Sequence, residues 1–113
     1  MKPAISLLLL VLFPFGVFAD TLNGKVVKIT DGDTLVVLDA GNTQHKIRLS
    51  GIDAPESNQP FGKRSKEALS GLVVGQRVEV DRHKHDRYGR ILGKVIAQGE
   101  DVNLAQVRTG MAW

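Results

Sequence analysis

An arginine and two carboxylates lie close together between residues 46 and 56, in the run Lys-Ile-Arg-Leu-Ser-Gly-Ile-Asp-Ala-Pro-Glu. Apolar and polar residues alternate through the first half of this run, which predicts a strand that carries Arg48 on its polar face. Gly51 permits a bend that residues with a Cβ resist, and Asp53 and Glu56 follow the bend. A cation and two carboxylates at the end of one strand suit a metal ion that meets an anionic substrate.

Two further carboxylates lie in the turn sequence Asp31-Gly32-Asp33, so Asp33 and Asp53 each lie in a turn beside a strand end. Two carboxylates that converge from separate turns repel each other unless a cation neutralises them. A hard ion such as Ca²⁺ suits two carboxylates, a backbone carbonyl and waters. Taken one at a time, either aspartate is better explained as an ordinary turn residue, because Asp favours turns through its side-chain hydrogen bonds.

Arg48 and Arg90 are candidates to hold a phosphate, and Glu56 is a candidate general base. A guanidinium offers a planar fork to phosphate oxygens and stays charged at any working pH. Two such groups and a divalent metal would stabilise the negative charge that develops during phosphodiester hydrolysis, while a glutamate would orient or deprotonate the attacking water. The alternatives are surface ion pairs for both arginines and an idle, solvated glutamate.

The polar segment before Arg90 supplies candidate contacts to a substrate. Tyr88 and Arg87 either stack on a base or touch a backbone phosphate, although Tyr88 is equally well explained as a packing residue. Lys84 lies between two histidines and adds a basic contact in a loop expected over residues 83–89. The chain has no cysteine and this run has no fourth ligand at a suitable spacing, so zinc is not expected here.

Taken together and in this order, the three stretches resemble the staphylococcal nuclease (thermonuclease) family over about residues 24–113. The run Asp-Arg-Tyr-Gly-Arg at 86–90 is similar to the family's Asp-Lys-Tyr-Gly-Arg. The resemblance implies that Asp33, Asp53 and the backbone carbonyl of Ala54 bind Ca²⁺, with Asp31 acting nearby or through water. Ala54 stands where the family often has Thr, which preserves a carbonyl ligand but would remove any role of the hydroxyl.

The same resemblance implies a secreted Ca²⁺-dependent nuclease that hydrolyses DNA and RNA with little sequence preference and leaves 3′-phosphate ends. Arg48 and Arg90 would hold the phosphoryl oxygens and Glu56 would activate water. The expected partners are DNA and RNA, preferably single-stranded, and the expected state is a monomer. Two alternatives stay open: a non-catalytic nucleic-acid-binding module, or an inactive truncated relative, because the family continues past Trp113 with a further aromatic residue and a C-terminal helix.

The hydrophobic pattern predicts a mainly β (α+β) domain. The expected strands cover residues 25–30, 34–38, 44–50, 77–81 and 90–97. A helix is expected from about residue 61 to 73, ended by Gly75, and a short one near the C-terminus with Asn103 as N-cap, Gln106 completing a capping box and Gly110 at its end. Five strands with a helix after the third make the OB-fold barrel pattern, and the family resemblance implies the same barrel.

Periodicity also predicts which side chains face the core. In the first strand Val27 and Ile29 are expected to lie on one side and Lys28 on the other, and the second strand is expected to be buried on both faces. The buried stripe of the first helix is expected to comprise Phe61, Ala68, Leu69, Leu72 and Val73. The buried stripe of the second helix is expected to comprise Leu104, Val107 and Met111.

Residues 1–19 are expected to be a cleaved signal peptide, leaving a domain of residues 20–113 that is short at its C-terminus relative to the family. Lys2 precedes an apolar run, and Val17-Phe18-Ala19 resembles a cleavage site. The run is shorter than the roughly 20 residues that span a bilayer, so we expect export to the periplasm or the medium without stable membrane association.

Composition excludes several classes of function. Loss of Lys2 lowers the Lys and Arg total from 15 to 14 against 12 acidic residues, and a net charge of +2 is too small for a polybasic binder. The chain has no cysteine, so it has neither disulfides nor a thiol nucleophile. No glycine-rich phosphate loop precedes a helix, which disfavours an ATP-using enzyme.

Overall fold

The computed structural model describes residues 21–113, in which three strands and a helix are followed by three further strands and a second helix. The elements are β1 (Thr21–Asp31), β2 (Thr34–Leu38), β3 (Gln44–Leu49), α2 (Gly62–Val73), β4 (Arg77–His85), β5 (Ile91–Ala97), β6 (Glu100–Asp101) and α3 (Val102–Arg108). The expected signal peptide at residues 1–19 lies outside the described residues. Within residues 21–113, no helix combines the length and the apolar character needed to cross a lipid bilayer.

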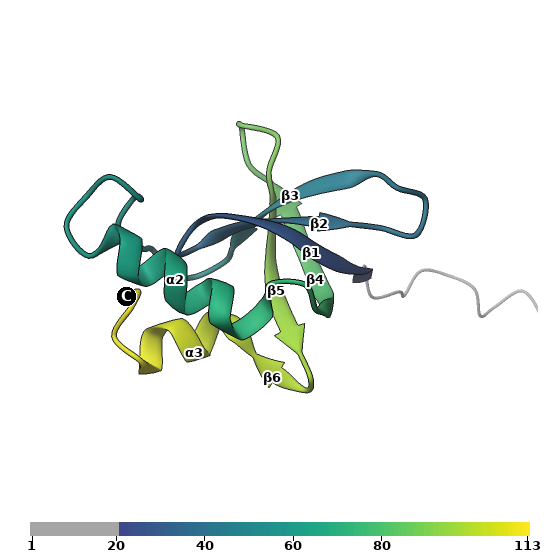
Figure 1. Ribbon diagram of the computed structural model, residues 1–113. Helices are drawn as coiled ribbons and strands as arrows, with labels where there is room; N and C mark the ends of the chain where they lie inside the picture. Colours follow the sequence, from purple (N-terminus) through teal and green to yellow (C-terminus); the bar gives the residue numbers. More distant parts are fainter. Residues whose placement is uncertain (1–20) are drawn as a thin grey trace, which may run out of the picture.

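The strands curl into a closed barrel (Figure 1). Antiparallel pairing joins β3, β2, β1, β4 and β5 in that order, and β5 then pairs in parallel with β3. At this closure Ile47 lies beside Ile91, and Leu49 lies beside Gly93. The predicted mainly β fold is therefore confirmed as a five-stranded OB-fold barrel with one helix after β3 and a short one after β5. The sequence pattern does not predict β6, a two-residue strand beside the end of β5.

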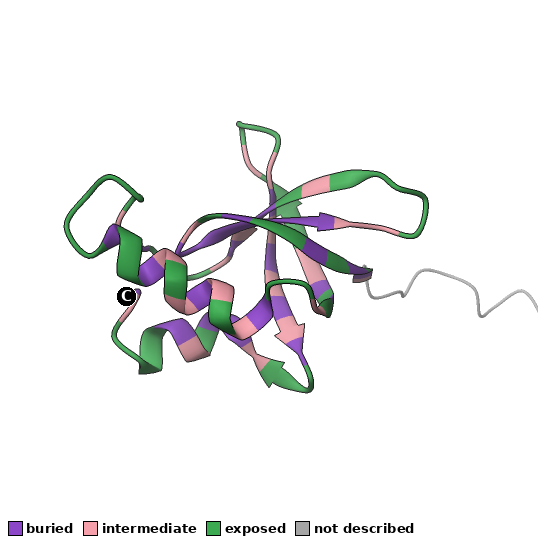
Figure 2. Cartoon of the chain, viewed as in Figure 1, coloured by how far each residue is buried: buried purple, intermediate pink, exposed green. Residues whose placement is uncertain are grey.

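Apolar side chains fill the barrel and continue beneath the two helices, as the buried segments in Figure 2 show. β2 is buried from Thr34 to Val37, as predicted for a strand covered on both faces. Helix α2 packs on β1, while α3 packs on β5 and on α2. The side chains with less than 2% exposure are Val26, Leu35, Val37, Ile47, Leu49, Ser65, Leu69, Val73, Val80, Val95 and Gln106.

A bulge in β1 changes which side chains of that strand face the core. Val26 pairs with Val37 and Lys28 pairs with Val36, so Val27 is the extra residue in the ladder. Val26 is fully buried and Ile29 is buried, whereas Val27 is 41% exposed. The prediction that Val27 and Ile29 lie on one side of the strand is therefore wrong, because strict alternation cannot anticipate a residue that the ladder skips.

β4 is longer than the alternating pattern predicts, and it runs to His85 rather than ending at Asp81. After a register shift, Lys84 pairs with Leu92 and His85 pairs with Ile91. The predicted loop over residues 83–89 is therefore wrong for its first part, because the long partner strand β5 supplies hydrogen bonds that override the polar composition.

The first helix buries part of its predicted stripe. Leu69 and Val73 are buried in α2, as expected, but in the first turn of the helix the buried residues are Gly62 and Ser65. Phe61 lies just before the helix with φ 65° and is 72% exposed, so its predicted burial is wrong. The left-handed backbone at Phe61 turns its side chain away from the helical stripe that periodicity assigns to it.

The second helix presents a different face from the predicted one. Leu104 is 41% and Val107 38% exposed, whereas Asn103 and Gln106 are buried. The N-cap is Asp101, whose side chain accepts a hydrogen bond from the Leu104 N–H. The predicted cap at Asn103 and the apolar stripe are therefore wrong, because periodicity counts apolar residues and here two amides face inward.

Candidate active site

One open hollow of about 460 Å³ gathers most of the predicted site residues. Its lining consists of Asp31, Asp33, Thr34, Arg48, Asp53, Ala54, Glu56, Gln59, Arg90 and Trp113. These residues come from the end of β1, the β1–β2 turn, the start of β2, β3, the loop that leads to α2, the residue before β5 and the end of the described chain. We refer to it as the site hollow.

Asp33 is the most enclosed carboxylate of the site hollow, with 5% exposure. Its backbone carbonyl accepts from the Leu49 N–H (2.8 Å), which ties the β1–β2 turn to β3. Its Oδ1 accepts from the Thr34 hydroxyl (2.8 Å) and its Oδ2 from the Ala54 N–H (2.9 Å). Burying a carboxylate costs free energy of folding unless it accepts hydrogen bonds. Each oxygen of Asp33 accepts one here.

Arg48 lies on β3 between the two candidate metal carboxylates. Its Nη1 donates to the carbonyls of Leu49 (2.7 Å) and Ile52 (2.9 Å). Its Nη2 lies 3.3 Å from Asp33 Oδ2 and 3.2 Å from Asp53 Oδ1. The side chain is only 18% exposed, so backbone carbonyls and carboxylates together fix the guanidinium in one orientation.

Glu56 and Asp53 lie on the exposed side of the site hollow. Asp53 has a side chain 62% exposed, and its Oδ1 also accepts from the Ala54 N–H (3.0 Å). Glu56 begins a short loop in which its N–H donates to Gln59 Oε1 (2.7 Å) and its carbonyl accepts from the Gln59 N–H (2.8 Å). Any side chain at Gly62 would collide with the Glu56 carbonyl, so this glycine lets the helix start pack against the loop.

Asp31 anchors this loop from the other side. Its Oδ1 accepts from both the N–H (2.9 Å) and the hydroxyl (2.7 Å) of Ser57, and that hydroxyl also donates to the Thr30 carbonyl. The role predicted for Asp31 near a metal stays a prediction, and its visible role is to hold the residue that follows Glu56.

Arg90 reaches the site hollow because β5 runs beside β3 in parallel. Its Nε donates to Asp86 Oδ2 (2.7 Å), and Asp86 Oδ1 accepts from the N–H groups of Tyr88 and Arg90 (2.9 Å each). Burial raises the pKa of the Asp86 carboxyl, but those N–H groups and the guanidinium lower it more, so the pKa lies below its ordinary value. Asp86 therefore acts as a charged brace that orients Arg90.

The remaining predicted substrate contacts lie outside the lining of the site hollow. Tyr88 is 68% exposed, and the guanidinium carbons of Arg87 and Arg90 lie 5.3 Å and 5.4 Å from its ring centroid, within cation–π range. Lys84 is exposed on β4. Tyr88 contacts Arg90, which lines the site hollow, whereas Lys84 and Arg87 are not among the residues that line it.

Residues 46–113 match the family described as staphylococcal nuclease homologue. The chain belongs to this family. Arg48, Asp53, Glu56 and Arg90 lie within the matched residues. Asp33 precedes them, and the β1–β2 turn brings it to the same hollow.

Several relatives carry nuclease names. A protein of Haemophilus influenzae named an uncharacterized endonuclease is 51% identical over 89 residues, which are 79% of this chain and 50% of that protein. One of Escherichia coli with the same name is 44% identical over 107 residues, covering 94% of this chain and 69% of that protein. A micrococcal nuclease of Shigella flexneri is 43% identical over 99 residues, covering 80% and 56%. The chain thus spans half to about two thirds of these relatives.

Two carboxylates converge in the site hollow, but they do not form a complete metal centre by themselves. Within residues 21–113, no three His, Asp or Glu side chains gather at one point. Asp33 and Asp53 both approach one nitrogen of Arg48, so a cation already lies between them. Their oxygens match the preference of a hard ion, which would take its other ligands from backbone, water or substrate.

Sequence reasoning missed the residue that positions the β1–β2 turn. The amide nitrogen of Gln106, on α3, donates to the carbonyls of Gly32 (2.8 Å) and Ser65 (3.1 Å). Gly32 leaves no room for a side chain, because one would collide with Ser65. Gln106 and Ser65 therefore fix the turn that carries Asp33. The available signal was a glutamine on the inward face of α3, which the capping-box interpretation assigned to another role.

Asn103 is a second missed positioning residue. Its amide nitrogen donates to the carbonyls of Ser50 (2.9 Å) and Gly93 (3.2 Å), and its oxygen accepts from the Val95 N–H (3.1 Å). The Ser50 N–H also donates to the Gly93 carbonyl (2.9 Å). Asn103 thus joins the end of β3 to β5, and so fixes where the chain leaves β3 toward Asp53.

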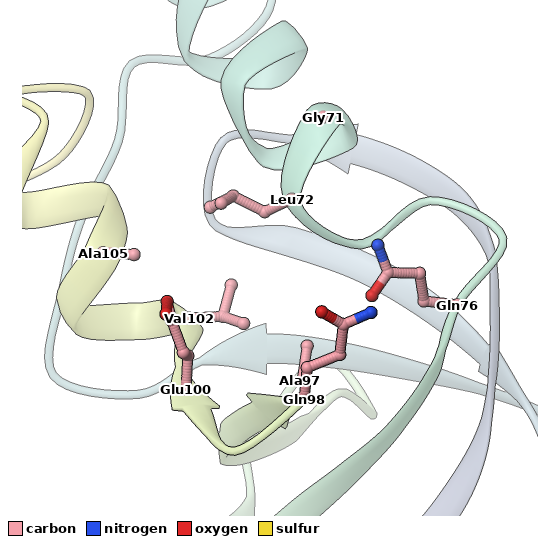
Figure 3. Close-up of a pocket in the computed structure, with 8 residues that line it drawn as sticks. All are labelled: Gly71, Leu72, Gln76, Ala97, Gln98, Glu100, Val102 and Ala105. Carbon is pink, nitrogen blue, oxygen red and sulfur yellow. The ribbon is translucent and has the colours of Figure 1, made fainter.

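A different hollow, of about 260 Å³, lies between the end of α2, the β5–β6 turn and α3 (Figure 3). The amides of Gln76 and Gln98 point toward each other across its edge, and Glu100 is its one carboxylate. Gln76 Oε1 is buried without a hydrogen-bond partner among the described residues. With no arginine and no paired carboxylates in its lining, this hollow lacks the charges for phosphate chemistry.

Proposed function

We propose that this chain is a Ca²⁺-dependent nuclease that hydrolyses phosphodiester bonds of DNA and RNA with little sequence preference. The observation that carries the proposal is the convergence of Asp33, Arg48, Asp53, Glu56 and Arg90 on one open hollow. The nuclease names of several relatives support the reaction class. In this proposal the protein is exported through residues 1–19 and acts as a monomer.

Two guanidinium groups bind the scissile phosphate in this proposal. Arg48 is held by two backbone carbonyls and Arg90 by Asp86, so neither has to reorganise when the substrate arrives. Groups oriented in advance stabilise the charge that develops on phosphoryl oxygens without an additional reorganisation cost. The acids Asp33 and Asp53 both lie close to Nη2 of Arg48, and their repulsion for phosphate would require a cation between acid and substrate.

Glu56 is the proposed general base. It takes a proton from water as the water oxygen bonds to phosphorus and the bond from phosphorus to the 5′ oxygen breaks, and the leaving oxygen gains a proton from solvent. This path leaves a 3′-phosphate on one product. The exposed position of Glu56 and its anchoring through Gln59 and Ser57 support the role, because a base must reach both water and substrate.

Asp33, Asp53 and the Ala54 carbonyl are the proposed ligands of Ca²⁺. When bound, the ion would neutralise charge on the phosphoryl oxygens and polarise phosphorus. Oxygen-only ligands favour Ca²⁺ or Mg²⁺ over softer metals, and the resemblance to the staphylococcal nuclease family supports Ca²⁺.

The test is digestion of single-stranded oligonucleotides and plasmid by purified chain over a titration of Ca²⁺, with Mg²⁺ and EDTA as the other arms. The expected result is Ca²⁺-dependent cleavage, abolished by EDTA, with 3′-phosphate ends detected by their resistance to 3′ extension until phosphatase treatment. Intact nucleic acid across the whole titration would overturn the proposal. Metal-independent binding without cleavage would instead identify a non-catalytic binding module.

A further inference from the structure

A small apolar hollow of about 230 Å³ adjoins the site hollow. It is lined by Pro55, Pro60, Phe61, Gly110, Met111 and Trp113. Trp113 lines both hollows, so they share one wall. Figure 1 shows the last residues of the chain beside the first turn of α2, where this hollow lies. We refer to it as the aromatic hollow.

Two aromatic side chains flank the aromatic hollow, and both are largely exposed. Phe61 is 72% exposed and Trp113 is 69% exposed. Aromatic rings are the largest apolar side chains, and leaving two of them in water beside one apolar hollow forgoes substantial burial. The two exposed rings beside this hollow offer a binding surface to a flat apolar ligand.

The backbone on both sides of the aromatic hollow is fixed, although the rings are exposed. The Trp113 N–H donates to the Asp53 carbonyl (2.9 Å), and the Asp53 N–H donates to the Trp113 carbonyl (2.8 Å). The Met111 carbonyl accepts from the Ser65 hydroxyl (2.7 Å). The ring of Trp113 therefore projects from backbone that is tied directly to a site carboxylate.

Phe61 has a left-handed backbone, with φ 65°. Such a conformation is strained for a residue with a bulky side chain and persists only where the surroundings enforce it. Here the Phe61 carbonyl accepts from the Ser65 N–H (2.9 Å), and the following Gly62 N–H donates to the Gln59 carbonyl (2.8 Å). A glycine at residue 61 would avoid the strain, so the presence of a phenylalanine at this position calls for a role of its side chain.

We propose that Phe61 and Trp113 form a stacking platform for an unpaired base next to the phosphate that occupies the site hollow. This proposal rests on the nuclease function proposed above. Base stacking on aromatic side chains tolerates any sequence, because every base has a π-face. Bases within a duplex are already stacked and paired, so the platform would favour single strands.

Tyr88 is an exposed aromatic residue in contact with Arg90, and the aromatic hollow adjoins the site hollow at Trp113. A strand whose phosphate lies between Arg48 and Arg90 would therefore have aromatic rings near two of the residues that line the site hollow.

Trp113 is the only tryptophan of the chain, so its fluorescence reports directly on the platform. The experiment titrates the whole chain with a short single-stranded oligothymidylate in EDTA, and the Glu56→Gln variant with the same oligonucleotide in Ca²⁺. A matched abasic oligomer with the same number of phosphates is the control ligand. We expect quenching by the oligothymidylate in at least the Ca²⁺ arm, and little quenching by the abasic oligomer.

Substitutions at residue 61 separate binding from folding. Phe61→Ala and Phe61→Gly should each weaken oligothymidylate binding about ten-fold, whereas Phe61→Gly should raise the melting temperature by relieving the strain. Val74→Ala, which truncates a residue 51% exposed at the other end of α2, should leave binding unchanged.

Equal quenching by the abasic oligomer, quenching in neither arm, or unchanged affinity in both residue-61 variants would overturn the platform. Quenching with these base and variant effects, in a protein that cleaves nothing, would support the platform while the nuclease proposal failed. Normal cleavage with unchanged affinity in the residue-61 variants would support the nuclease proposal and overturn the platform.

Discussion

The two sides of the site hollow are built in contrasting ways. On the barrel side, Asp33 and Arg48 lie on or beside paired strands, and their side chains are 7% and 18% exposed. On the loop side, Glu56 is exposed, and the loop that carries it is held by a local hydrogen bond to Gln59 and by a bond from Ser57 to Asp31 at the end of β1. On the barrel side the fold thus fixes the charged side chains themselves, whereas on the loop side it fixes the backbone and leaves the Glu56 side chain exposed.

This difference separates two requirements of the proposed reaction. Charges that stabilise a transition state work best when the fold fixes them in advance. A general base has to reach a water molecule whose position depends on the substrate, so an exposed loop serves it better. Substitutions on the barrel side should therefore affect folding and activity together, and those on the loop side should affect activity alone.

Arg48→Met should have the largest effect, because it removes a cation that both Asp33 and Asp53 contact. We expect kcat/KM to fall about 10³-fold and the free energy of unfolding to fall by about 3 kcal/mol, since the enclosed Asp33 loses its partner. Release of acid-soluble nucleotides and urea unfolding measure the two quantities. Arg77→Met, at an exposed position on β4, is the control, and unchanged stability in Arg48→Met would remove the contrast between the two sides.

Glu56→Gln should lower kcat by about 10²- to 10³-fold and change the free energy of unfolding by less than about 0.5 kcal/mol. The amide keeps the shape of the side chain but cannot accept the proton of water. Single-turnover cleavage and urea unfolding provide the comparison with Arg48→Met. Glu79→Gln, another exposed glutamate, should retain full activity, and a loss of stability in Glu56→Gln would contradict the description of the loop side.

Gln106→Leu tests whether the barrel side is positioned from α3. The substitution removes the donor to the Gly32 and Ser65 carbonyls, which are enclosed between the two helices and the β1–β2 turn. We expect the free energy of unfolding to fall by about 2 kcal/mol, with a smaller loss of activity in the folded fraction. Urea unfolding followed by cleavage assays at low temperature measures both. Val107→Leu, at the exposed neighbouring position, is the control, and equal stabilities would show that Gln106 does not hold the turn.

Asp86→Asn should give the smallest effect, with a pH dependence. Burial raises the pKa of Asp86 but donors to its carboxylate lower it more, so the folded pKa lies below the unfolded value. The carboxylate therefore stabilises the fold above the unfolded pKa, and this contribution disappears as the pH falls through the folded pKa. Thermal melts from neutral to acidic pH should show a slightly lower melting temperature for the variant that converges with the wild type in acid. A constant difference at every pH would contradict the role of the charge.

The sequence predicted the stretches that carry the proposed chemistry and most strands of the barrel. Alternation identified β3 with Arg48 on its polar side, and the turn residues identified where Asp33 and Asp53 lie. Those signals are local, because a strand's period and a turn's composition depend on residues close together in the chain. The roles assigned to the site residues remain predictions until activity is measured.

Pattern reasoning failed where a distant backbone group decides the orientation of a side chain. Val27 is turned outward by a bulge against β2, and Asn103 is turned inward by carbonyls on β5 and at the end of β3. Neither partner is visible in the local sequence. When a helix buries two amides, the apolar pattern assigns its buried face to the wrong side. Only the acceptors of those amides show that the amide face is the buried one.

By itself, the sequence determined which chemical groups this protein has, and in which turns and strands they lie. Only the tertiary structure decided that Asp33, Arg48 and the Ala54 N–H meet, and that Gln106 holds the Gly32 turn across 74 positions of the chain. The physical reason is that enclosed polar groups must find partners wherever the closed barrel brings donors and acceptors together, and this depends on pairing between strands and not on sequence distance.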